Sequence, residues 1–214
     1  MKYVGIPLGM WVLFEKSFLK HLVSVFGYNK NTAKSISKSA KLKYKDIIHS
    51  LPEFEKGDRF LVNIVNCAML CAFILSMPKR PKLCELTEFY ANAMMTKTMK
   101  WFCRQSGKKK FSKSDKQLMQ ETALKKYADR NPYSWNMDYY EYADGSGYEA
   151  RFTKCGICAL MTKLGLYDLT PALCNLDYTM SEAGEASNFV REYTLASGGL
   201  YCDCGYKKKT GGEK

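Results

Sequence analysis

Reactive side chains concentrate in the last third of this 214-residue chain, between residues 152 and 206. Thiols and carboxylates are the groups that ligate metals, act as nucleophiles or transfer protons. We therefore expect the chemistry of the protein in this segment. The group consists of five of the nine cysteines, Cys155, Cys158, Cys174, Cys202 and Cys204, together with Asp177 and Asp203.

Two cysteine pairs, Cys155–Cys158 and Cys202–Cys204, offer the four thiolates that a structural zinc or iron–sulfur site requires. On an extended strand, however, alternate side chains lie about 7 Å apart, which is wide for chelating one ion. We therefore expect no cofactor and keep a zinc or iron–sulfur site on these four cysteines as an alternative. If Cys155 opens a helix, the helix N-terminus would lower the pKa of its thiol.

Cys174 and Asp177 lie one helical turn apart. A carboxylate at that spacing could orient a nucleophile, act as a general base, or cap the next element. Arg191 falls on the apolar face of an expected strand, where an arginine needs a carboxylate partner, either Asp177 or a substrate. His21 and His49 lie far from this segment in sequence, so acid–base chemistry there falls to Asp, Glu, Cys or Tyr.

Strand parity separates the residues of the Cys202-Asp203-Cys204 motif. Side chains alternate between the two faces of a strand, so Asp203 is expected to point away from both cysteines. Asn63 and Asn66 lie one turn apart on an expected apolar helix. Buried amides need polar partners, so their shared face is expected to meet a helix end or a substrate pocket.

The elements that position these residues are expected to be helices followed by strands. Turn residues at 144–147 and at 197–199 each predict a hairpin. The predicted fold class is α+β, a helical N-terminal half packed on a small antiparallel sheet of about four strands built from two hairpins. The expected helices span residues 8–27, 34–50, 60–77, 87–101, 114–127 and 155–164, with a short one from Thr170; the expected strands span 138–143, 148–154, 188–196 and 200–207.

The chain is expected to divide into three parts. Residues 1–50 form a basic helical extension, and residues 208–214 form a flexible tail. Residues 51–207 form the α+β domain, with helices in 60–130 and the sheet and site in 135–207. The three lysines at 108–110 are expected to form a solvated turn.

The net charge of +12 favours anionic partners. Residues 1–50 hold nine Lys or Arg and two Asp or Glu, without a dense aromatic–basic strip, so we expect no nucleic-acid partner. The apolar run at 60–77 carries two asparagines, so we expect a buried helix and no integral membrane span. The N-terminus is a poor signal peptide and the cysteine count is odd, which predicts a reducing, cytoplasmic location. We expect a small anionic substrate; the sequence leaves the oligomeric state open.

Two segments, GYEARFTKCGICALMTKLGLYDLTPALCNLDYTMSEAG and FVREYTLASGGLYCDCGY, resemble the L-2-amino-thiazoline-4-carboxylic acid hydrolase family. The resemblance covers about residues 55–207. Its most specific marks are the Cys-Gly-Ile-Cys turn, the Cys-x-x-Asp motif and the Gly-Gly-x-x-Cys-Asp motif. It implies a hydrolase that opens a thiazoline carboxylate or a similar cyclic amidine, in the named case giving N-carbamoyl-L-cysteine.

Such a reaction assigns expected roles to the residues above. Cys174 would be the nucleophile or lie beside the attacking water, and Asp177 would be the base or orient the amidine. Arg191 would hold the substrate carboxylate. The alternatives are a thiolate metal-binding protein and a non-catalytic sensor of a small ligand. The remaining pocket residues would be Cys158, Cys202, Asp203, Asn63 and Asn66.

Overall fold

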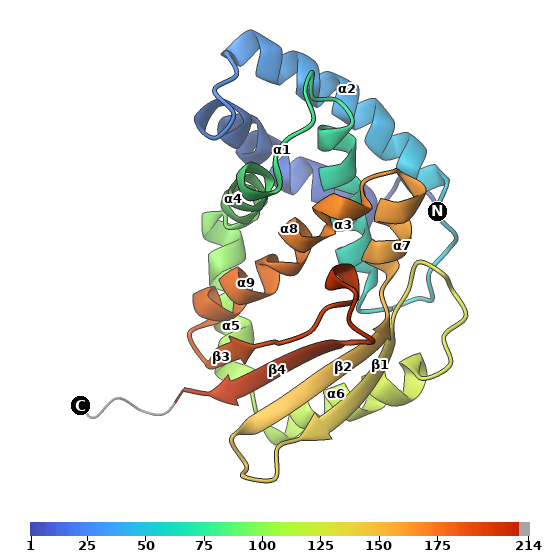
Figure 1. Ribbon diagram of the computed structural model, residues 1–214, viewed down its shortest axis with the longest axis vertical. Coiled ribbons are helices and arrows are strands. Elements are labelled where there is room, and N and C mark those ends of the chain that lie inside the picture. The colour runs from blue at the N-terminus through green and yellow to red at the C-terminus, as the bar shows by residue number, and fades with distance from the viewer. Residues whose placement is uncertain (210–214) are drawn as a thin grey trace, which may run out of the picture.

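The computed structural model describes residues 1–209 and confirms the α+β class (Figure 1). Helices fill the N-terminal half, and the strands follow near the C-terminus. Residues 210–214 of the expected tail lie outside the described residues, and Lys208 belongs to the last strand. The helices are α1 Ile6–Ser24, α2 Lys30–His49, α3 Leu61–Ile74, α4 Leu83–Met94, α5 Lys97–Lys109, α6 Lys113–Lys126, α7 Gly156–Lys163, α8 Thr170–Cys174 and α9 Leu176–Gly184, with 3-10 turns η1 Tyr167–Leu169 and η2 Leu195–Ser197.

Four antiparallel strands form one sheet in the order β1-β2-β4-β3. The first predicted hairpin is confirmed, with β1 Asn136–Glu141 and β2 Gly147–Lys154. The predicted strand at 188–196 is wrong beyond Val190, where β3 Ser187–Val190 ends. The chain then passes through η2 before it enters β4 Cys202–Lys208.

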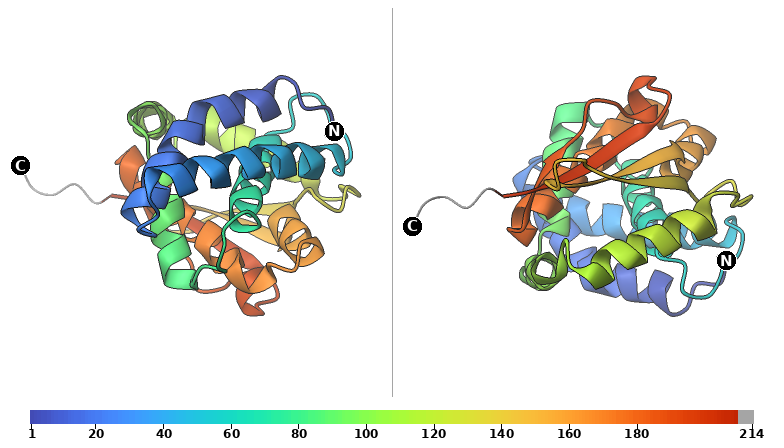
Figure 2. Two further views of the ribbon diagram at one scale, coloured as in Figure 1. Left: turned by 90° about the horizontal axis from the view of Figure 1, so that it is seen from above. Right: turned by 90° about the horizontal axis from the view of Figure 1, so that it is seen from below.

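The N-terminal helices share one hydrophobic core with the rest of the chain. Trp11 of α1 stacks on Phe73 of α3 with ring centroids 5.5 Å apart, and Phe18 packs on the same ring at 4.7 Å. Tyr44 of α2 is fully buried and its hydroxyl donates to the Pro7 carbonyl at 2.7 Å. Figure 2 (left) shows α1 and α2 side by side above α3. The basic segment therefore packs through its apolar face and presents lysines to solvent.

The central helix α3 is apolar almost all round, and its residues from 64 to 74 are buried. Within residues 1–209, no helix combines the length and the apolar character needed to cross a membrane. Helices α7 and α8 pack on α3 and α4, and α9 packs on β3, so these helices lie between the N-terminal helices and the sheet (Figure 1).

The helix expected over residues 87–101 is two helices. Met95 leaves the helical conformation, and the Thr96 hydroxyl accepts a hydrogen bond from the Met99 N–H at 3.2 Å. This side-chain cap starts α5 in a new direction. As a result α5 extends to Lys109, and Lys110 lies at its C-terminal end.

Candidate functional site

A cavity of about 340 Å³ lies against one face of the sheet. Helices α3, α6, α7, α8 and α9 and the loops next to them supply the rest of its wall. Because β2 and β4 are antiparallel, matched side chains from the two strands form its floor, and the small Ala150 leaves space opposite a thiol. The cross-strand pairs are Tyr148–Tyr206, Ala150–Cys204 and Phe152–Cys202.

Gly156 sets the close approach between the end of β2 and the loop before β1. A Cβ atom at this position would lie 1.9 Å from the Tyr133 carbonyl oxygen, so no other residue fits without moving the backbone. The glycine separates Cys155 from Ile157, and both of these line the cavity. The Cys-Gly-Ile-Cys turn therefore shapes the wall of the site.

Asp177 and Arg191 form an ion pair at the cavity wall, with Arg191 Nη1 and Asp177 Oδ2 2.8 Å apart. Arg191 Nη2 also donates to the Cys174 carbonyl at 2.8 Å, and the Arg191 side chain is only 7% exposed. Of the two partners that the sequence leaves open for Arg191, the structure shows the protein carboxylate. The guanidinium thus ties the start of α9 to the end of α8.

The Asp177 side chain is 44% exposed and lines the cavity. Part of its accessible surface therefore faces the cavity. Burial raises the pKa of Asp177, and the paired Arg191 opposes that rise. A carboxylate with a raised pKa is a stronger base than an unperturbed one, and a general base is a group of this kind.

Four of the five C-terminal cysteines line the cavity, and Cys158 does not. Burial raises the pKa of Cys174 to about 12, with Arg191 acting in the opposite direction. Burial also raises the pKa of Cys202 and of Cys204. The lowered pKa expected for Cys155 is wrong, because the neighbouring Cys158 thiol and burial raise it. The cavity therefore presents neutral thiols.

The geometry gives no support to the metal alternative on Cys155, Cys158, Cys202 and Cys204. In the part of the chain that the structure describes, no group of three or more His, Cys, Asp or Glu side chains is placed to hold a metal ion. The Cys202 sulfur is instead contacted by the Leu195 N–H at 3.2 Å.

Of the three expected pocket residues Asp203, Asn63 and Asn66, only Asn63 lines the cavity. Asp203 points to the opposite sheet face from Cys202, as parity predicts, and its carboxylate accepts the backbone N–H groups of Glu192 and Tyr193 at 2.9 and 2.6 Å. It shapes the loop after β3 and does not line the cavity. Asn63 lines the cavity, whereas Asn66 is buried beside it in α3 and is not part of the wall.

Sequence reasoning missed Lys110 and Arg59, two cations of the cavity wall. Lys108 and Lys109 are exposed as predicted, but they belong to α5 rather than to a turn; Lys110, which leaves the helix, is only half-exposed and lines the cavity. Its ammonium lies 3.4 Å from the centroid of the Tyr206 ring. The signal that could have found it is the end of α5, because a helix that continues to Lys109 turns the next side chain away from the exposed lysines.

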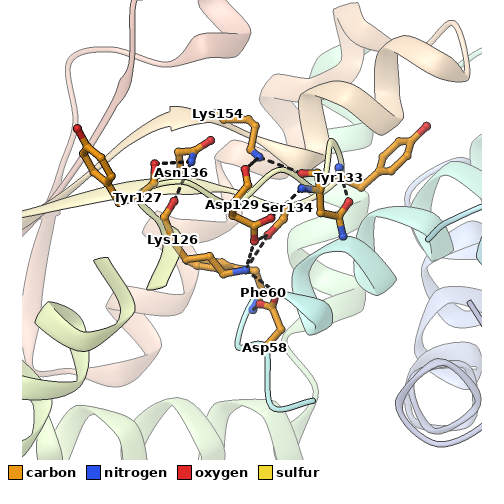
Figure 3. A network of polar contacts seen from close by, with 10 residues as sticks. Asp58, Phe60, Lys126, Tyr127, Asp129, Tyr133, Ser134, Asn136 and Lys154 are labelled. Carbon is orange, nitrogen blue, oxygen red and sulfur yellow. Dashed lines mark hydrogen bonds and ion pairs between the residues drawn. The ribbon is translucent and has the colours of Figure 1, made fainter. Parts of the chain in front are cut away.

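A buried polar network, shown in Figure 3, holds the loop that carries Arg59. Lys126 of α6 donates to Asp58 and to Asp129 at 2.5 Å each, and to Ser134 at 2.8 Å. The Lys126 and Asp58 side chains are 8% and 3% exposed. The network therefore fixes the chain near Asp58 and Ser134. Phe60 and Trp135, which follow these residues, stack in the cavity wall with ring centroids 5.0 Å apart.

A second hollow of about 690 Å³ adjoins the cavity. Its outer wall includes exposed apolar residues of α1, α3 and α5, such as Leu13, Val62 and Phe102. We call this second space the outer hollow. The residues that line both spaces are Arg59, Lys110, Asp177, Met180 and Tyr206.

Fold and site together define a small α+β protein whose cavity is lined by apolar side chains, a carboxylate–guanidinium pair, phenols, thiols and two further cations. Cavities that are mostly apolar with a few convergent polar groups are typical sites for small molecules. A family model described as L-2-amino-thiazoline-4-carboxylic acid hydrolase matches residues 80–206. The match covers more than half of the chain, and the chain belongs to this hydrolase family.

No curated protein matches the chain, and no solved structure does. The matched segment contains Lys110, Cys174, Asp177 and Arg191. The part of the cavity wall formed by Arg59, Phe60 and Asn63, in α3 and the loop before it, precedes the matched segment. The matched segment thus contains the other residues of the cavity wall.

Proposed function

We propose that the protein hydrolyses the ring of a small cyclic amidine carboxylate, of the 2-amino-thiazoline-4-carboxylate type. The observation that carries the proposal is the Asp177–Arg191 pair, whose carboxylate lines the cavity in a chain of this hydrolase family. The cavity volume of about 340 Å³ suits a small ligand. The nine cysteines, all unbridged, support a reducing location such as the cytoplasm.

The reaction needs one water and one proton acceptor. With the ring nitrogen protonated, water adds to C2, an O–C2 bond forms, and Asp177 takes a water proton. The tetrahedral carbon then forms C=O, the C2–S bond breaks, and the hydroxyl proton leaves to solvent. The leaving sulfur takes the proton that Asp177 holds, and the product is a free thiol with a urea group. General-base help of this kind contributes roughly 10²–10⁴-fold to a rate.

Arg191 acts in this proposal through Asp177. Its contacts with Asp177 and with the Cys174 carbonyl fix the carboxylate at the start of α9. Away from a cavity, such a pair would be an ordinary internal ion pair. Because the Asp177 carboxylate lines the cavity, it can act as a positioned base. A positioned base lowers the barrier because its orientation is fixed before the substrate arrives.

The raised pKa of the Cys174 thiol favours direct attack by water over a covalent route. A nucleophilic cysteine reacts as the thiolate, and its pKa must be low for that. The pKa of about 12 keeps Cys174 protonated near neutral pH. We propose that this thiol lies beside the attacking water, and that Cys202 and Cys204 supply a polarisable surface for the substrate sulfur.

Turnover of 2-amino-thiazoline-4-carboxylate tests the proposal. N-carbamoyl-cysteine is quantified by chromatography and mass spectrometry, with and without a chelator. We expect product at the same rate in both samples. Loss of turnover with the chelator would favour the metal alternative, whereas binding without any product would favour the non-catalytic sensor.

A further inference from the structure

Two cations at the boundary between the cavity and the outer hollow lack a carboxylate partner. Arg191 is paired with Asp177, but no ion pair within residues 1–209 involves Lys110 or Arg59. Both line the inner cavity and the outer hollow. Unpaired charge held beside a cavity is costly to desolvate, so such groups are candidates for binding an anion.

The backbone directs Lys110 inward. Lys110 leaves the helix with ψ 139°, and Phe111 has φ 64°, a left-handed conformation that costs energy for a residue with a Cβ atom. The Phe111 N–H donates to Asp115 at 2.8 Å, and the Tyr148 hydroxyl donates to the same carboxylate oxygen at 2.7 Å. A strained turn is thus held by two hydrogen bonds, and its effect is to place one lysine in the cavity.

Aromatic rings hold the lysine ammonium in place. It lies 3.4 Å from the Tyr206 ring centroid and 5.0 Å from that of Tyr148. No hydrogen bond from this ammonium occurs among the described residues. Burial lowers the pKa of Lys110 to about 8, with the nearby Asp115 opposing and Arg59 reinforcing the change. The ammonium therefore retains its donors for a ligand.

Arg59 is fixed on one side and open on the other. Its Nη1 contacts the Met119 sulfur at 3.4 Å and the Thr122 hydroxyl at 3.1 Å. Within residues 1–209 its Nε and Nη2 have no hydrogen-bond partner. The adjacent Asp58 is anchored by Lys126, as Figure 3 shows, so the arginine starts from a rigid point.

We propose that Arg59 and Lys110 form the subsite for the carboxylate of the substrate, at the mouth of the cavity. The Tyr206 ring connects the two ends of the site, since Lys110 covers its face and the Asp177 charge acts on its hydroxyl. A small ring carboxylate bound there places its ring between Tyr206 and Asp177. The ring-opening role rests on the proposed function, whereas the subsite itself requires only a small carboxylate.

Calorimetric titration with two non-hydrolysable probes tests the subsite: thiazolidine-4-carboxylate and the uncharged thiazolidine-4-carboxamide. We expect the native protein to bind the carboxylate about tenfold or more tightly than the amide, the effect of one or two charge-assisted hydrogen bonds. Lys110→Met and Arg59→Met should each remove most of that preference. The exposed neighbour Lys109 supplies the matched control, and Lys109→Met should keep it. Thermal melts check that each variant is folded.

A native protein without this preference, or folded Lys110→Met and Arg59→Met proteins that both retain it, would overturn the subsite. Turnover is scored separately. Carboxylate preference lost in both variants, in a protein that never opens the thiazoline ring, would uphold the subsite and reject the proposed function. Conversely, a native protein that opens the ring, with the carboxylate preference unchanged in both variants, would uphold the proposed function and reject the subsite.

Discussion

Removing the Lys126 ammonium should destabilise the protein strongly. Lys126→Met leaves Asp58 and Asp129 without their shared cation, and Asp58 is only 3% exposed. Breaking a buried ion pair by deleting one partner costs about 3–5 kcal/mol, because the other charge stays buried and uncompensated. For a chain of this length, each kcal/mol lowers Tm by about 2–4 °C, so the melting temperature should fall by roughly 6–20 °C.

The same network should make the stability of the protein depend on pH in the acid range. Burial alone would raise the pKa of Asp129, but hydrogen bonds from Lys126 and Ser134 outweigh it and hold that pKa below its usual range. A depressed folded-state pKa contributes stability above the unfolded-state value of about 4 and loses it as the pH falls through the folded-state value. The difference in stability between the native protein and Lys126→Met should therefore narrow below about pH 4.

Differential scanning calorimetry from pH 3 to pH 7 measures both effects. Lys125 is the exposed neighbour on α6, and Lys125→Met should leave Tm almost unchanged. The triple variant Asp58→Asn, Lys126→Met, Asp129→Asn removes all three charges and should recover part of the loss. The expected fall in melting temperature is roughly 6–20 °C. A Lys126→Met protein that melts within about two or three degrees of the native one would refute the reasoning.

Three further predictions concern the cavity. Cys174→Ser should keep turnover within about tenfold, since water attacks directly; loss of all turnover with the fold intact would support a covalent thiol. Arg191→Met should lower kcat more than it raises KM if the arginine positions Asp177, whereas a rise in KM alone would restore its predicted role as the carboxylate clamp. Carboxylate affinity should fall as the pH rises through about 8, where Lys110 loses its proton. The charged and titratable groups near that ammonium are Arg59, Asp115, Tyr148 and Tyr206. If Lys110 is the group that titrates, the pH dependence of carboxylate affinity should vanish in Lys110→Met and persist in Lys109→Met.

Local periodicity predicted how some residues near the sheet are oriented. The parity of the Cys202-Asp203-Cys204 strand follows from the two-residue repeat of a strand, and the structure places Asp203 away from both cysteines. The one-turn spacing of Cys174 and Asp177 brings both to the cavity, across the junction of α8 and α9. For Arg191 the sequence left a protein carboxylate and a substrate carboxylate open, and the structure shows the pair with Asp177, 14 residues away in sequence.

The cation side was not predicted, because contacts with distant parts of the chain hold the segments that carry Lys110 and Arg59. Lys110 faces inward through the left-handed Phe111, which is held by Asp115 of α6 and, through that carboxylate, by Tyr148 of β2. Arg59 lies in a loop whose sequence, Glu-Lys-Gly-Asp-Arg-Phe, is typical of an exposed turn. Its neighbour Asp58 is buried by Lys126, 68 residues away in sequence. Neither contact leaves a periodic signal.

Initial rates of thiazoline ring opening by Asp177→Asn test the central claim most directly. The matched control is Asp168→Asn, which alters an acidic residue whose side chain is 67% exposed. If Asp177 is the base, its variant should lose roughly 10²–10⁴-fold in kcat and keep its affinity for thiazolidine-4-carboxylate, while the control stays at the native rate. A folded Asp177→Asn protein that opens the ring at the native rate would contradict the assignment of the cavity as the catalytic site.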